Sequence, residues 1–318
     1  MVPARENISR VSLLPNPITE KRMIPARYQD YEETVTVGCV NYDSVWGDKA
    51  ANLEKIKGMI TEAADQGINI LAFPELALSG YECNVDFTMH RQAAETIPGP
   101  ATEEIAALTK KLDIYVAFGM PEQDKNDPDV CFIACPLIGP DGLIGTYRKI
   151  HIGPLPMFTE TMCFQGGTVV PVFETRYGPI GIQICADFWV YPELSRILML
   201  KGARLIINST GSADAPDRPF YMTSMTCARA TENMLYTASA NFVGKDRAKS
   251  YYGHSTIAGP DFPRFSKVYA QGTDKEEIVS ATLSFEKLHR FRETISIDKL
   301  RRSEVIMKEF HNLEACRS

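Results

Sequence analysis

Apolar and polar residues are spaced along the chain in a way that predicts repeated strand–helix–strand units. Residues Thr34–Tyr42 alternate as in a strand, and Asp48 is placed to cap a following helix that ends at Gly67. The predicted helix has one apolar face, made of Leu53, Ile56, Ile60, Ala63 and Ala64. Residues Ile68–Phe73 form a second, buried strand that stops at Pro74. This order predicts a right-handed parallel crossover.

The same pattern recurs further along the chain. Three further helices are predicted, over Thr102–Leu112, Pro192–Lys201 and Phe220–Met234. Two hairpins are predicted, one over Cys131–Ile150 around Pro140-Asp141-Gly142 and one over Val172–Cys185 around Tyr177-Gly178-Pro179. Single strands are predicted over Ile114–Met120, Ala203–Asn208, Leu235–Val243, Ser255–Ala258, Lys267–Ala270 and Glu277–Leu283. Parallel crossovers with hairpins at the outer edges indicate an α/β protein with two mixed sheets and helices outside.

No shift in composition and no Gly/Ser linker divides this pattern, so one domain is expected over residues 34–284. Residues 1–33 are rich in Pro and Arg with weak periodicity, and we interpret them as an N-terminal extension. The charge density rises after the last strand. Residues 285–318 are therefore expected to form a charged C-terminal arm, at the surface or at a subunit interface.

Charge and composition exclude several classes of protein. The 318 residues include 34 Lys and Arg against 40 Asp and Glu, so 34 − 40 gives a net charge of −6 without a basic block. Nucleic-acid binding is therefore not expected. No apolar run approaches the roughly 18 residues of a membrane span, and residues 1–10 do not resemble a secretory signal. The eight cysteines lack CxxC spacing, which indicates reduced thiols in the cytoplasm and no metal site.

Three chemically reactive side chains follow predicted strands. Glu75 comes shortly after the strand that ends at Phe73, Lys149 lies near the end of a hairpin strand, and Cys185 ends the strand that begins at Ile180. Functional groups collect at such strand ends in α/β sheets. Glu75 could take the thiol proton, and Lys149 could stabilise both the thiolate and an oxyanion. The backbone N–H of Ala186 could complete an oxyanion hole.

These segments together resemble the carbon–nitrogen hydrolase (nitrilase) superfamily, from about Val35 to the tail. The matching segments, in chain order, are Phe73-Pro74-Glu75 with Gly80-Tyr81, Tyr147–His151, Glu160 with Phe164 and Gly166, Gly181–Asp187 with Pro192-Glu193, Arg229–Asn233 with Ala240-Asn241 and Gly244, Gly253–Ser255, and Leu300–Arg302. Their occurrence in the family's order makes the resemblance specific.

The resemblance implies a four-layer αββα sandwich and a thiol-dependent hydrolysis of non-peptide C–N bonds. It implies that Glu75 is the general base and acid, Lys149 the oxyanion stabiliser, Cys185 the nucleophile and Glu160 an orienting second carboxylate. No metal or organic cofactor is implied. A homodimer or higher homo-oligomer, with C-terminal arms exchanged between subunits, is also implied.

The residues after the nucleophile bear on the substrate. Cys185-Ala186-Asp187 resembles the amidase and carbamoylase side of the family rather than true nitrilases. Relatives that act on carboxylate-bearing substrates often have Arg within a few residues of the cysteine, whereas Phe188 and Trp189 stand here. We therefore expect an amidase for a small neutral, apolar or aromatic amide, with Tyr81, Phe188 and Trp189 as candidate substrate contacts. Pro192 and Glu193 stand one residue further from the cysteine than is common in the family, which could reshape the pocket.

Alternative functions remain open at this point. Within the family, the substrate could instead be an N-carbamoyl amide or a nitrile. A thiol protease would need His151 or His254 as the base, and neither lies in a protease motif. A non-catalytic scaffold member would usually lack one of the three catalytic residues, and all three are present in this chain.

Overall fold

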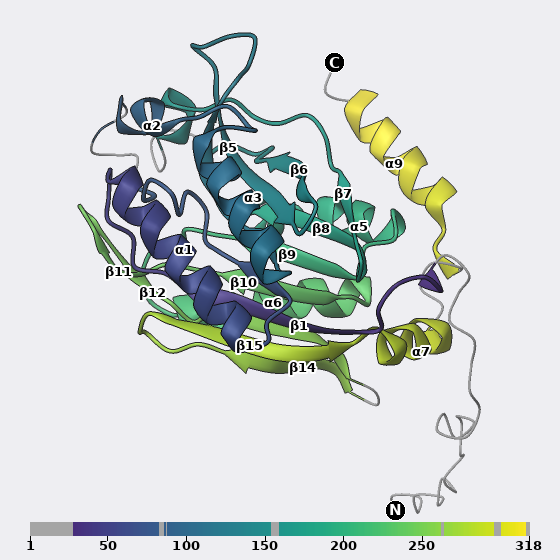
Figure 1. Ribbon diagram of the computed structural model, residues 1–318. Helices are drawn as coiled ribbons and strands as arrows, with labels where there is room; N and C mark the ends of the chain where they lie inside the picture. The colour runs from purple at the N-terminus through teal and green to yellow at the C-terminus, as the bar shows by residue number, and fades with distance from the viewer. Residues whose placement is uncertain are drawn as a thin grey trace, which may run out of the picture.

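Two β-sheets lie face to face in the computed structural model of the chain (Figure 1). The structure describes residues 28–82, 86, 88–153, 159–261, 264–295 and 300–315. Most of the extension predicted over residues 1–33 therefore lies outside the described residues.

The first sheet has the strand order β15-β1-β2-β3-β5-β4, with β6 paired to β5. Strands β1, β2 and β3 are parallel, as predicted for crossovers, and the other pairings are antiparallel. The strands of this sheet are β1 (Thr34–Asn41), β2 (Ile70–Ala72), β3 (Tyr115–Ala117), β4 (Met120–Gln123), β5 (Cys131–Gly139), β6 (Gly142–Arg148) and β15 (Glu277–Ser284).

The second sheet has the order β14-β13-β10-β9-β8-β7, in which β8, β9 and β10 are parallel. Its strands are β7 (Val172–Thr175), β8 (Gly178–Ile184), β9 (Leu205–Ser209), β10 (Tyr236–Ala240), β13 (Thr256–Asp261) and β14 (Arg264–Gln271). A separate hairpin is formed by β11 (Val243–Asp246) and β12 (Lys249–Tyr252).

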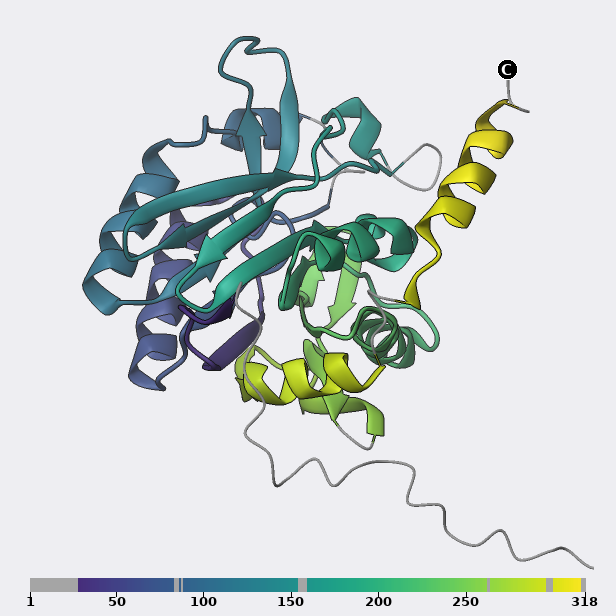
Figure 2. The same ribbon diagram turned by 90° about the vertical axis from the view of Figure 1, so that its right-hand side faces the viewer.

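Helices cover the outer faces of both sheets (Figure 2). On the first sheet these are α1 (Lys49–Asp65), which the Asp48 side chain caps as predicted, and α3 (Pro100–Leu112). On the second sheet they are α5 (Pro192–Leu200) and α6 (Arg218–Asn233). Shorter helices are α2 (Thr88–Ala93), the 3-10 turn η2 (Glu160–Met162) and α4 (Ala186–Trp189). The fold is thus the predicted αββα sandwich.

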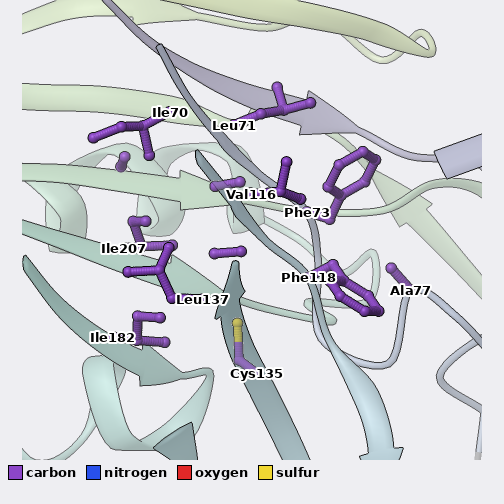
Figure 3. Close-up of a cluster of buried hydrophobic side chains, with 14 of the residues drawn as sticks. Ile70, Leu71, Phe73, Ala77, Val116, Phe118, Cys135, Leu137, Ile182 and Ile207 are labelled. Carbon is purple, nitrogen blue, oxygen red and sulfur yellow. The ribbon is translucent and has the colours of Figure 1, made fainter. Parts of the chain in front are cut away.

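The main hydrophobic core fills the space between the sheets. Figure 3 shows Ile70, Leu71, Val116 and Leu137 of the first sheet beside Ile182 and Ile207 of the second. All six side chains are fully buried. Burying an aliphatic side chain of this size contributes about 1.5–3 kcal/mol, so this layer fixes how the two sheets are placed relative to each other.

A buried arginine ties the start of the described chain and the residue that follows β15 to the sandwich. Arg204 precedes β9, has no exposed surface, and donates to Oε1 of Glu33 (3.1 Å) and to the carbonyl of Glu32 (2.9 Å). Its guanidinium also lies 3.7 Å from the ring centroid of Phe285. Phe285 begins α7 (Phe285–Ile295), whose residues Phe285, Leu288 and Phe291 are buried. The first part of the charged tail is therefore packed against the body.

The last helix, α9 (Ser303–Ala315), stands away from the sandwich in both views (Figures 1 and 2). Its exposed apolar side chains are Val305, Ile306, Met307, Phe310 and Leu313.

Two predicted strands are interrupted. The strand expected over Ile114–Met120 splits into β3 and β4 at Gly119, where the backbone passes the Glu75 loop. The N–H of Gly119 donates to the carbonyl of Pro74 (3.1 Å), and its carbonyl accepts from the N–H of Leu78 (3.1 Å). The strand expected over Leu235–Val243 ends at Ala240, and the chain then enters the β11–β12 hairpin, which the hydrophobic pattern did not predict.

Candidate active site

The four predicted catalytic side chains come from the ends of strands and from one turn. Glu75 follows β2 after two residues, and Lys149 directly follows β6, so both come from the first sheet. Cys185 directly follows β8 of the second sheet, and Glu160 begins η2. Because the two sheets face each other, the site includes side chains from both layers.

Lys149 lies between two carboxylates. Its Nζ is 2.8 Å from Oε1 of Glu75 and 2.8 Å from both carboxylate oxygens of Glu160. All three residues are at most 1% exposed. Burial lowers the pKa of Lys149, but the charges of Glu160 and Glu75 outweigh it and hold this pKa well above its ordinary value. Lys149 is thus a fixed positive charge.

Glu160 is anchored by further donors. The Tyr81 hydroxyl donates to its Oε1 (2.6 Å), and the N–H of Gly153 donates to its Oε2 (2.8 Å). Burial raises the pKa of Glu160, but the Lys149 charge and these donors outweigh it and lower the pKa below its ordinary value. Glu160 is therefore suited to stay anionic and to hold Lys149.

Glu75 is in a different electrostatic situation. Burial raises its pKa to about 7, against the opposing charge of Lys149. The N–H of Gly211 donates to its second oxygen, Oε2 (3.1 Å). A carboxylate whose pKa is close to neutrality can accept a proton in one step and return it in the next. Glu75 is therefore suited to carry a proton between steps, whereas Glu160 is suited to remain a carboxylate anion.

Cys185 has a strained backbone at the turn between β8 and α4. Its φ is 49° and its ψ is −106°, a combination that is costly for a residue with a Cβ and is typical of functional sites. Its N–H donates to the carbonyl of Ser209 (3.1 Å) and to Oδ1 of Asn208 (3.2 Å) at the end of β9. The Ser209 hydroxyl donates to the carbonyl of Phe73 (2.9 Å), which links this end of the second sheet to the Glu75 loop.

The thiol of Cys185 is half-buried and needs a base. Burial and the charge of Glu75 raise its pKa to about 12, although Lys149 and a hydrogen bond from Thr210 act in the opposite direction. A thiol with such a pKa is protonated at neutral pH. It becomes a nucleophile only if a neighbouring group takes its proton, and Glu75 is a neighbour that is partly deprotonated at neutral pH because its pKa is about 7.

The remaining predicted site residues have different surroundings. Ala186 is the first residue of α4, where helical N–H groups have no acceptor within the helix. Tyr81 is 3% exposed and contacts Glu160. Phe188 has no exposed surface and packs in a second hydrophobic cluster with Leu198 and Met222.

Trp189 is linked to the thiol of Cys185 through Thr210. Its indole N–H donates to the Thr210 hydroxyl (3.2 Å), the group that hydrogen-bonds Cys185. Its ring also lies 5.7 Å from that of Tyr221. Whether Tyr81, Phe188 and Trp189 contact a substrate stays a prediction.

Sequence reasoning did not select Thr210 or Asp187 as site residues. Thr210 directly follows β9, so its place at the end of a central strand was an available signal. Asp187 stands two residues after Cys185. Its carboxylate accepts hydrogen bonds from Tyr147, Ile150 and His151, which only the packing of the two sheets brings close to it. In the residues that the structure describes, no group of His, Cys, Asp and Glu side chains is arranged to hold a metal ion. No helix within the described ranges is long and apolar enough to cross a membrane.

Comparison with known proteins places this geometry in a family. The family model described as carbon-nitrogen hydrolase matches residues 36–293. "Probable nitrilase C965.09" of Schizosaccharomyces pombe is 32% identical over 253 residues, which are 79% of this chain and 89% of that protein. Human "Omega-amidase NIT2" is 30% identical over 270 residues, 82% of this chain and 93% of that protein. The crystal structure of Saccharomyces cerevisiae Nit3, described as a member of branch 10 of the nitrilase superfamily, matches with a TM-score of 0.75 at 25% identity and covers 86% of this chain and 98% of that one.

Proposed function

The chain belongs to the carbon–nitrogen hydrolase family and is an amidase-type hydrolase, and we propose that it cleaves a small neutral, apolar or aromatic amide through a thioester on Cys185. The observation that carries this proposal is the placement of Lys149 2.8 Å from both Glu75 and Glu160 beside the thiol. This arrangement supplies a base, a fixed cation and a nucleophile in one site.

The proposed first half-reaction forms the thioester. Glu75 takes the proton of the Cys185 thiol, and the sulfur attacks the amide carbon, so that the carbonyl electrons move to oxygen. The Lys149 ammonium and the Ala186 N–H stabilise this oxyanion. Glu75 then gives its proton to the leaving nitrogen, the C–N bond breaks, and ammonia or an amine departs.

The second half-reaction restores the enzyme. Glu75 takes a proton from water, and the resulting hydroxide attacks the thioester carbon. The C–S bond breaks, the carboxylic acid leaves, and the proton on Glu75 returns to the sulfur. Glu160 stays anionic throughout and holds Lys149 in place.

The substrate class is proposed from the surroundings of the thiol. Cys185 packs at the edge of the cluster that contains Phe188 and Trp189, with Tyr221 against the same cluster. An apolar or aromatic acyl group suits such walls. An N-carbamoyl amide or a nitrile is the alternative within the family, and a non-catalytic scaffold is the alternative outside catalysis.

One observation favours a second substrate class, an amide that also carries a carboxylate. Arg218 begins α6, is exposed, and its guanidinium lies 5.4 Å from the ring centroid of Tyr221. Burial raises the pKa of Tyr221, and the charge of Arg218 opposes this rise. Tyr221 packs against the same cluster as Cys185, so the second class that we propose is an amide whose carboxylate pairs with Arg218.

Intact-mass spectrometry tests the function and the substrate class together. The enzyme is mixed with pairs of amides matched in size, one neutral and one with a carboxylate, and the thioester adduct and ammonia release are followed. We expect an adduct on the wild type and none on Cys185→Ala. The control is Cys227→Ala, which removes a half-buried free thiol of α6 and should still form the adduct. A preference for the carboxylate partner would overturn the neutral class, and no adduct with any amide would favour the scaffold.

We also propose that the protein is a homo-oligomer in the cytoplasm. The exposed apolar residues of α9, together with Ile197 and Leu200 of α5, are of the kind that interfaces bury. The free thiols Cys39, Cys131, Cys135, Cys163, Cys185 and Cys227 suit a reducing compartment. Analytical ultracentrifugation of the wild type and of a Phe310→Ser, Leu313→Ser variant tests the first point, and a monomeric wild type would contradict it.

A further inference from the structure

The buried carboxylate of Asp187 makes four hydrogen bonds to the segment that carries Lys149. Its Oδ2 accepts from the Tyr147 hydroxyl (2.7 Å) and from the N–H of Ile150 (2.9 Å). Its Oδ1 accepts from the N–H of His151 (2.9 Å) and from His151 Nδ1 (2.7 Å). A carboxylate has about four acceptor sites, so these donors satisfy it completely.

The donors flank Lys149 on both sides. Strand β6 ends at Arg148, so the N–H groups of Ile150 and His151 have no partner in a sheet. The N–H of Lys149 itself donates to the carbonyl of Ile133 on β5 (2.9 Å), and its carbonyl accepts from Gly167 (2.7 Å). Asp187 thus holds the chain where it leaves the sheet, immediately after the lysine.

The other side of Asp187 is joined rigidly to the nucleophile. Only Ala186 separates it from Cys185, and all three lie in the turn that starts α4. The N–H groups of Phe188 (2.9 Å) and Trp189 (3.0 Å) both donate to the carbonyl of Cys185, and Gln183 Nε2 donates to the carbonyl of Asp187 (2.8 Å). A shift of the carboxylate would therefore shift the nucleophile turn with it.

From these contacts, and given the function proposed above, we infer that Asp187 is a positioning residue that sets the place of Lys149 relative to Cys185. It fixes at the same time the two groups that would meet the oxyanion. The Lys149 ammonium is carried by the segment that Asp187 binds, and the Ala186 N–H belongs to the residue that directly precedes Asp187. A displacement of about 1 Å between such groups can cost about 100-fold in rate.

The pKa of Glu75 shows whether Asp187 positions Lys149 or only stabilises the fold, because this pKa depends on the distance between Glu75 and Lys149. The groups that face Glu75 are Lys149, Glu160, Cys185 and the N–H of Gly211, and Lys149 is the one that lowers its pKa most. If Lys149 moves away, the pKa of Glu75 must rise above about 7. Loss of the Asp187 charge alone acts in the opposite direction, because removing an anion makes it easier to ionise another. Unfolded protein is told apart by the same reaction in urea, where Cys185 reacts as an ordinary thiol with a pKa of about 8.5.

The experiment measures the rate at which iodoacetamide alkylates Cys185 as a function of pH, in the wild type and in Asp187→Asn. The sulfur displaces iodide and its proton passes to Glu75, so the reaction needs no knowledge of the substrate. We expect the rate to fall below about pH 7 in the wild type. Asp187→Asn puts an NH₂ group against at least one backbone N–H, and we expect the fall in the alkylation rate to move upward by about half a pH unit or more.

Two further variants complete the test. Asp141→Asn removes the same charge from the exposed turn of the β5–β6 hairpin and should match the wild type. Tyr147→Phe removes one of the four donors and should move the profile in the same direction by less, so it carries the test if Asp187→Asn does not fold. A wild-type profile with no fall near neutrality contradicts Glu75 as the base and hence the proposed function. The positioning role alone is overturned if the alkylation rate of the folded Asp187→Asn variant falls at the same pH as in the wild type. If only Tyr147→Phe folds, the same result in that variant overturns it.

Discussion

The Tyr81 hydroxyl and the Lys149 ammonium bind the same oxygen of Glu160, at 2.6 and 2.8 Å. Tyr81 was expected as a wall of the substrate pocket, and the structure gives it a direct contact with the second glutamate. A phenol that donates to a carboxylate makes a charge-assisted hydrogen bond, which is stronger than a neutral one. Glu160 is therefore held from two directions.

Replacement of Tyr81 by Phe should weaken catalysis by removing this donor. A hydrogen bond to a charged group is worth about 1.5–3 kcal/mol, so we expect kcat to fall by about 10- to 100-fold. Steady-state kinetics with the best amide measures the change. Tyr31→Phe is the matched control, since Tyr31 donates to Glu174 (2.7 Å) in the same way near the N-terminus. Equal losses in both variants would show that Tyr81 has no special role.

The pH dependence of kcat/KM should follow Glu75. The base must be deprotonated to accept the thiol proton, and its pKa is about 7, so activity should fall as the pH drops through 7. The sign for stability is opposite. A pKa raised in the folded state from its ordinary 4.5 favours folding fully at low pH, and this contribution is lost as the pH rises through 7.

A pH–rate profile and urea unfolding at several pH values check both parts. Glu75→Gln should lose activity at every pH. As the pH rises from about 4.5 to 7, the unfolding free energy of the wild type should decrease relative to that of Glu75→Gln. An activity limb near pH 4.5 would show that burial does not control this carboxylate.

Gly119 should tolerate no side chain, because it passes directly behind Glu75. A Cβ at this position would lie 2.3 Å from the nitrogen of Leu76 and 2.6 Å from Cα of Glu75. We expect Gly119→Ala to displace the Glu75 loop and to lower the unfolding free energy by about 2 kcal/mol or more. The folded fraction of this variant should also have a lower kcat than the wild type. Gly58→Ala in α1 meets nothing within 4 Å and should instead stabilise by up to about 1 kcal/mol. Thermal unfolding and kinetics on both variants make the comparison.

Replacement of the buried Arg204 should lower the unfolding free energy more than replacement of an exposed, ion-paired arginine. Arg204→Met leaves Glu33 and the carbonyl of Glu32 without their buried donor, and we expect a loss of about 3 kcal/mol in unfolding free energy. Arg176→Ala breaks an exposed ion pair with Asp113 and should cost about 1 kcal/mol or less. Urea denaturation midpoints decide between them, and equal values would contradict the argument from burial.

The sequence predicted the parts of the fold that depend on local patterns. Strand β1, helix α1 with its Asp48 cap and the β5–β6 hairpin agree with the structure, because periodicity and turn residues determine them. The break at Gly119 was missed because it arises from contact with the Glu75 loop. Helix α7 looked like part of a surface arm, since its buried Phe285, Leu288 and Phe291 stand among many charges.

The candidate site shows the same division. Cys185, Lys149 and Glu75 could be selected because each lies at or near the end of a predicted strand. The contacts of Asp187 could not, because their donors belong to Tyr147 on β6 and to Ile150 and His151 just beyond it, and no spacing in the sequence indicates that β6 and β8 end side by side.

The division of the reactive groups between two layers has a consequence for the molecule as a whole. Glu75 and Lys149 belong to one sheet and Cys185 to the other, so neither layer by itself holds a complete set of reactive groups. A chain cut in the loop between β6 and β7 would give two inert fragments. Turnover would return only when they reassociate, with β15 of the C-terminal fragment paired again to β1 of the N-terminal one, so the amidase rate would measure the fraction of assembled pairs.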